Sequence, residues 1–133
     1  MKLRSMTCSD LAIIDASTNR ISCINILDDV KMAQFPALAS TFAVSAIFER
    51  SADEKAGDRN LELEISIDGD TIVKGPIFVA FQGALTTRAM ITLNGFVYPR
   101  PGRLKASILD DGVEMGDWQF SVGAIEAVEQ SAI

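Results

Sequence analysis

Basic side chains collect in one stretch of the chain that contains no acidic residue. Between residues 71 and 109 there is no Asp or Glu, although the whole chain carries 18 acidic and 12 basic residues and a net charge of −6. The basic residues of this stretch are Lys74, Arg88, Arg100, Arg103 and Lys105. Guanidinium and ammonium groups bind carboxylates and phosphates, so segment 74–105 predicts a site for an acidic protein surface or a small anionic ligand.

Four of these cations, Arg88, Arg100, Arg103 and Lys105, are the predicted partner- or ligand-binding residues, and the last three flank the turn 99–102. The competing interpretation is structural. In it the cations lie opposite the acidic face of strand 61–67 and neutralise that face. The sequence is compatible with both interpretations.

Carboxylates occur in pairs that could hold a metal ion or share acid–base work. Asp-Asp dipeptides stand at 28–29 and 110–111, but calcium requires six or more oxygen ligands and no EF-hand spacing surrounds either pair. Glu62 and Glu64 alternate with apolar residues, which is the ordinary pattern of a strand with one wet face. We therefore predict solvated carboxylates, no metal site and no catalytic pair.

The chain contains no histidine. This absence removes the commonest general base, the histidine-dependent nucleophile systems and imidazole-based zinc sites. The negative net charge disfavours nucleic acid as a partner, because most of the surface repels a phosphate backbone. We predict that the protein is not an enzyme and uses no cofactor.

The two cysteines, Cys8 and Cys23, are expected on neighbouring strands of one hairpin. Pairing Ile14 with Ile21 places Cys23 opposite Ala12 and separates the thiols by about 13 Å, too far for a disulfide. We expect both thiols to be reduced. No apolar run of signal or membrane-spanning length occurs, so we predict a cytoplasmic protein without membrane contact.

The elements that must position these side chains are strands. Apolar residues recur with a period of two in two rows, one formed by Leu61, Leu63, Ile65 and Ile67 and the other by Phe42, Val44, Ala46 and Phe48. Turn signals stand at Asp68-Gly69, 99–102 and Asp111-Gly112, and Gly75-Pro76 is expected to end a strand. The pattern predicts an all-β, immunoglobulin-like antiparallel β-sandwich of about seven to nine strands, in one domain over 1–123. Residues 124–133 are expected to form a frayed tail or a short helix.

Two hairpin registers follow from these turns. Around Asp68-Gly69, Ile67 should pair with Asp70 and Ile65 with Ile72. Around Asp111-Gly112, a bulge at Gly116 is needed so that the strand places two aromatic residues, Trp118 and Phe120, in the core opposite Ala106 and Leu104.

The order of features resembles a known family. It comprises segment 9–16, Asn19-Arg20-Ile21, Asn25-Ile26-Leu27, Phe35-Pro36, Leu93-Asn94-Gly95-Phe96, the turn 99–102 and Asp111-Gly112. This pattern is similar to a family of small, uncharacterised bacterial and phage-associated β-sandwich proteins, a domain of unknown function. The resemblance implies a fold and no chemistry, because its motifs are turn and core residues.

Two function classes follow. The first is a non-enzymatic interaction or structural module that acts through protein–protein contacts, including self-association. The second is a binder of a small anionic ligand, a nucleotide or phosphorylated metabolite, at segment 74–105.

Overall fold

The computed structural model describes residues 1–54 and 57–126. Within these residues the chain forms nine strands and no helix, and therefore no helix long and apolar enough to cross a membrane. The strands are β1 (Lys2–Ile14), β2 (Ile21–Ile26), β3 (Asp29–Met32), β4 (Ala37–Glu49), β5 (Arg59–Ile67), β6 (Asp70–Val79), β7 (Thr86–Tyr98), β8 (Gly102–Asp110) and β9 (Val113–Ala124). The predicted tail 124–133 begins at the last residue of β9, and 127–133 lie outside the described residues.

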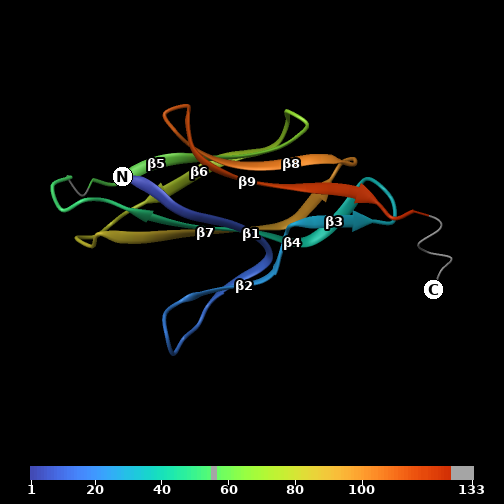
Figure 1. Cartoon of the computed structure of the whole chain (residues 1–133). Coiled ribbons are helices and arrows are strands. Elements are labelled where there is room, and N and C mark those ends of the chain that lie inside the picture. Colours follow the sequence, from blue (N-terminus) through green and yellow to red (C-terminus); the bar gives the residue numbers. More distant parts are fainter. Residues whose placement is uncertain (55–56, 127–133) are drawn as a thin grey trace.

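The strands form two sheets packed face to face (Figure 1). Sheet A has the order β2-β1-β4-β7 and sheet B has the order β3-β9-β8-β5-β6. The predicted all-β sandwich is confirmed, while its immunoglobulin-like connectivity stays a prediction. The prediction that all strands run antiparallel was wrong at one place. Strand β3, which the sequence pattern did not predict, runs parallel to β9.

The core lies between the sheets and is built from the two predicted rows. All eight residues of the β4 and β5 rows are buried. Phe42 lies 4.5 Å from Phe96 of the same sheet and 6.3 Å from Phe120 of sheet B, measured between ring centroids, so its ring joins the two layers. Aromatic pairs at such distances add to the stabilisation that burial gives.

The β5–β6 hairpin turns at Asp68 and Gly69, both with positive φ, as a two-residue turn requires. Ile67 pairs with Asp70 as predicted. The prediction for Ile65 was wrong: it pairs with Val73, because a bulge inserts one extra residue into β6.

The β8–β9 hairpin contains the predicted bulge and pairs Ala106 with Trp118 and Leu104 with Phe120. The irregularity falls one residue earlier than expected, because Gly116 is paired with Ile108. Gly116 has a steric role instead, since a Cβ there would lie 2.7 Å from Cδ2 of Leu3. Phe120 is fully buried, whereas Trp118 is half-buried at the edge of the core and donates its indole N–H to the carbonyl of Leu27 at 2.7 Å.

The expectation that Gly75-Pro76 ends a strand was wrong, because β6 runs through both residues. Pro76 pairs with Glu62 of β5, and β6 is the last strand of sheet B. Proline is tolerated in an edge strand, where its missing N–H need not serve a second neighbour.

The β1–β2 hairpin leaves sheet A beyond Ser9. Up to the pair Ser9–Ala43, β1 is paired with β4, and from there to Ile14 its only paired strand is β2. The departure is marked by a positive φ at Asn25 and by a hydrogen bond of 2.5 Å from the Thr41 hydroxyl to the carbonyl of Asp10. Figure 1 shows the hairpin extending away from the sheet.

Candidate functional site

The predicted basic residues lie on two different sheets. Arg103 and Lys105 project from β8 in sheet B, and Arg100 lies in the turn just before that strand. Arg88 lies on β7 in sheet A. The structure therefore brings three of the four residues to one region and places Arg88 elsewhere.

Two of the three cations on sheet B are paired with carboxylates. Arg100 is 2.5 Å from Asp70, and Lys105 is 2.8 Å from Glu114. The hydrogen bond from Lys105 lowers the pKa of Glu114 and raises the pKa of Lys105 itself. Arg103 instead contacts neutral oxygens, on Gln119 at 3.4 Å and Ser121 at 3.3 Å.

Acidic side chains share the outer face of sheet B with these bases. A shallow groove of about 380 Å³ is lined by Arg103 and Lys105 together with three carboxylates, those of Glu64, Asp68 and Glu114. On β6, Lys74 is 3.4 Å from Glu62. These contacts favour the structural interpretation of the cations of sheet B, since each paired base lies beside an acid of its own chain.

The β1–β2 hairpin presents one face to the outer surface of sheet A. Residues paired across a hairpin project from the same face of it. Ala12 and Cys23 are such a pair, as the sequence predicted, and Ile21 of β2 lies on the same face, two residues from Cys23. Ala12 is buried, and the Cys23 sulfur lies 3.8 Å from the hydroxyl oxygen of Ser45 on β4. This inner face makes the hairpin a third layer over part of sheet A.

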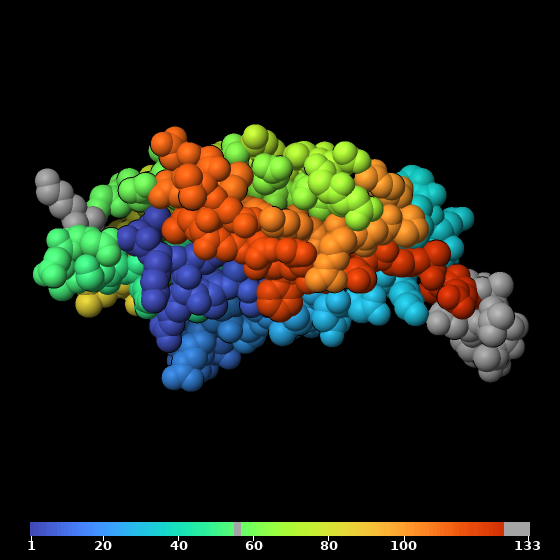
Figure 2. Space-filling view, turned by 45° about the horizontal axis from the view of Figure 1, so that its top comes forward, coloured from blue at the N-terminus to red at the C-terminus, as the bar shows by residue number. Residues whose placement is uncertain are grey.

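The opposite face of the hairpin is apolar and exposed. Leu11 and Ile24 are cross-strand partners, Ile13 lies two residues beyond Leu11, and Ile26 lies two residues beyond Ile24. These four residues, the hairpin row, have exposed fractions of 38–51%. In the space-filling view the hairpin projects from the body of the molecule (Figure 2). This surface was not predicted from the sequence, although four consecutive apolar residues, 11–14, indicate a strand with two apolar faces.

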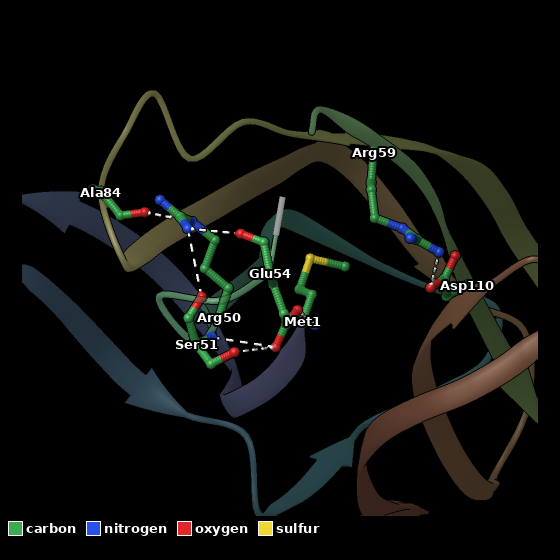
Figure 3. Close-up of polar contacts among 7 residues, drawn as sticks. All are labelled: Met1, Arg50, Ser51, Glu54, Arg59, Ala84 and Asp110. Atoms are coloured by element: carbon green, nitrogen blue, oxygen red, sulfur yellow. Dashed lines mark hydrogen bonds and ion pairs between the residues drawn. The ribbon is translucent and has the colours of Figure 1, made fainter. Parts of the chain in front are cut away.

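A different polar cluster ties loops together at the end of the sandwich near the N-terminus (Figure 3). Arg50 donates from Nε to the carbonyl of Ala84 at 2.8 Å and from Nη1 to the carbonyl of Glu54 at 3.1 Å. The Glu54 carboxylate accepts from the Met1 ammonium group, which lowers the pKa of Glu54. Arg59 pairs with Asp110 at 2.5 Å in the same view, so one aspartate of that Asp-Asp dipeptide serves an ion pair. These contacts hold the loops that follow β4 and β6.

Metal-binding and thiol chemistry have little support in the described part of the chain. Residues 1–54 and 57–126 contain no group of three or more His, Cys, Asp or Glu placed to hold a metal ion. Cys8 and Cys23 are both free thiols, as predicted. Burial, with a smaller contribution from Cys23, raises the pKa of Cys8 to about 12, so its thiol stays protonated and unreactive at neutral pH.

Comparison with known proteins identifies the family of the chain but no activity. No curated protein matches the chain at a significant level. A family model does match, over residues 4–123, which includes all nine strands except residues 2–3 of β1 and 124 of β9. The chain thus belongs to the family of unknown function DUF6941.

Proposed function

We propose that this domain is a non-enzymatic interaction module that associates with a second copy of itself through the hairpin row. The supporting observation is that the hairpin has two apolar faces and uses only one of them within the chain. A hairpin that serves only as a third layer over sheet A needs an apolar inner face, but its outer face can be polar. Contiguous exposed apolar surface on a folded domain is typical of an interaction site.

The lack of charge on the hairpin row makes it the surface through which a second copy can bind. The chain carries a net charge of −6, so two copies repel each other over most of their surfaces. The hairpin row and Ser22, the cross-strand partner of Ile13, contain no charged side chain. An uncharged apolar face is complementary to itself, as a two-fold symmetric contact requires.

The contact is proposed to be face to face rather than edge to edge. β2 is an outer strand of sheet A, so one side of its backbone is open to pairing. However, Asn25, within its six residues, has a φ of 56°, which interrupts a straight edge. Local irregularities of this kind hinder strand addition in natural sheets.

The test is the mass of the protein in solution as a function of concentration, measured by sedimentation velocity. We expect a monomer–dimer equilibrium in the micromolar range that Ile24→Glu abolishes. Val113→Glu is the matched control, because Val113 is more exposed, at 70%, and lies on the β8–β9 hairpin. A wild-type protein that stays monomeric at several hundred micromolar, or a control that dissociates as Ile24→Glu does, would contradict the proposal.

Salt distinguishes this contact from one made by the cations of sheet B. Apolar association is unaffected or strengthened by added salt, whereas association through Arg100, Arg103 and Lys105 is weakened by screening. We expect dimerisation to persist at 0.5 M sodium chloride and in Arg100→Glu/Arg103→Glu. The proposed setting is the cytoplasm, as expected from the lack of a signal-length apolar run, in a bacterial or phage-associated context, as the resemblance implies.

A further inference from the structure

A cavity of about 530 Å³, open to solvent, lies between the tip of the β1–β2 hairpin and the outer face of sheet A. The hairpin contributes Asn19, Arg20 and Ile21, and sheet A contributes Ile47 of β4 and residues 86–88 of β7. The volume falls within the range of small-molecule sites in proteins, roughly 300–1,000 Å³. The cavity exists only because the hairpin folds over the sheet, and it is distinct from the outward hairpin row.

Two guanidinium groups line this cavity, and neither is paired with a carboxylate of the described residues. Arg88 donates from Nη1 to the carbonyl of Asn19 at 2.6 Å and from Nη2 to the side-chain oxygen of Asn19 at 2.8 Å. A guanidinium has five N–H donors, so three remain for a ligand. The Arg20 side chain makes no hydrogen bond or ion pair within residues 1–54 and 57–126, and no described residue lining the cavity is acidic.

The two arginines differ in how firmly they are held. Asn19 fixes the Arg88 guanidinium and is itself held by a hydrogen bond of 2.8 Å from its N–H to the carbonyl of Asp15. A donor group held in place before binding loses less conformational entropy when a ligand arrives. Arg20 is exposed and unrestrained, so it can close over a bound anion.

The rest of the cavity is suited to the uncharged part of a ligand. Ile21 and Ile47, both half-buried, supply apolar walls from opposite sides. Thr86 adds an exposed hydroxyl beside Arg88, while the Thr87 hydroxyl already donates to the carbonyl of Ala80 at 2.9 Å. Two cations beside two apolar side chains match a molecule with a doubly charged head and a small apolar body.

We propose that this cavity binds a phosphate monoester carrying a small apolar group. The phosphate accepts hydrogen bonds from Arg88 and Arg20, and the apolar group packs between Ile21 and Ile47. Guanidinium groups suit phosphate because their planar donors match its oxygens in pairs. The site does not depend on the proposed self-association, because the hairpin row lies on the other face of the hairpin.

The test is a titration of the full chain with phenyl phosphate at low ionic strength, followed by amide NMR shifts. We expect saturable shifts at Asn19, Arg20 and residues 86–88, with weaker binding of inorganic phosphate and of phenol. Arg20→Gln should weaken binding about ten-fold without disturbing the fold, since its side chain holds nothing else. Arg103→Gln removes the same charge from sheet B and should change the affinity less than two-fold.

Several results would overturn the proposal. They are an absence of saturable shifts, shifts centred on Arg103 and Lys105, and equal effects of Arg20→Gln and Arg103→Gln. Equal affinity for inorganic phosphate would also overturn it, because it would show adventitious ion binding only. Repeating the titration with Ile24→Glu separates the two proposals, since binding should survive in a protein that no longer self-associates.

Discussion

Arg88 of β7 and Asn19 of the β1–β2 turn are joined by two hydrogen bonds across 69 positions of sequence. These bonds, with the contact of Cys23 and Ser45, hold the hairpin against the outer face of sheet A. The Arg88–Asn19 pair thus connects the edge strand of the sheet to the tip of a segment that has left that sheet.

Loss of the Arg88 side chain should loosen the hairpin without unfolding the sandwich. In Arg88→Ala, hydrogen exchange of amides in 11–26 should accelerate about five-fold, which corresponds to about 1 kcal/mol for partly exposed charge-assisted bonds. Exchange in β5 should not change, and Arg103→Ala should leave both regions as they are. Uniform acceleration in all strands would show that the pair supports the whole fold.

Ile65 tests the assignment of faces. It is fully buried in the core row of β5, so Ile65→Ala should lower the free energy of unfolding by about 2–5 kcal/mol in urea denaturation. Glu64→Ala, on the wet face of the same strand, should change it by less than about 0.5 kcal/mol. A small effect at Ile65 would mean that the two faces are exchanged.

Gly102 should tolerate no side chain. A Cβ there would collide with Oδ2 of Asp68, whose other oxygen accepts the Arg103 N–H at 2.9 Å. We expect Gly102→Ala to lower the midpoint of urea unfolding, at a cost of about 1–3 kcal/mol. Gly75→Ala is the control, because nothing lies within 4 Å of a Cβ at that position. Similar midpoints for the two variants would contradict the steric argument.

The two thiols should differ in reactivity. At pH 8, a thiol reagent should modify the half-buried Cys23 and leave Cys8 intact until the protein unfolds, because the thiolate is the reactive form. The raised pKa of Cys8 means that the neutral thiol stabilises the fold below pH 9.0 and that this contribution is lost between pH 9.0 and about 12. Rapid modification of Cys8, or a Cys8–Cys23 disulfide in unreduced protein, would contradict the structure.

The sequence was sufficient to predict the elements whose signals are local. Alternation along β5 identified its buried face, and the turn residues located both hairpins. The register of β6 was not predictable, because Ile72 and Val73 are both apolar and either can face Ile65. The bulge in β9 was predictable, because without it Trp118 and Phe120 would face outward.

The candidate sites depend on contacts between distant segments, and they could be predicted only in part. Segment 74–105 includes Arg88, but sequence spacing could not show that its hydrogen-bond partner is Asn19. Arg20 was missed because an isolated arginine in a turn resembles any solvated charge. β3 was missed because four residues beside an Asp-Asp dipeptide give too short a pattern to recognise.

The third layer over sheet A has a consequence for how the family can vary. Residues 42–46 of β4 are buried on both faces, by sheet B on one side and by the hairpin and neighbouring strands on the other. In a saturation-mutagenesis screen, β5 should therefore show tolerance at every second position. The centre of β4 should instead appear as an unbroken block that rejects both charged and bulky replacements, with Ala43 and Ser45 confined to small residues. Family members that lack the hairpin should lose this restriction and admit polar residues at these two positions.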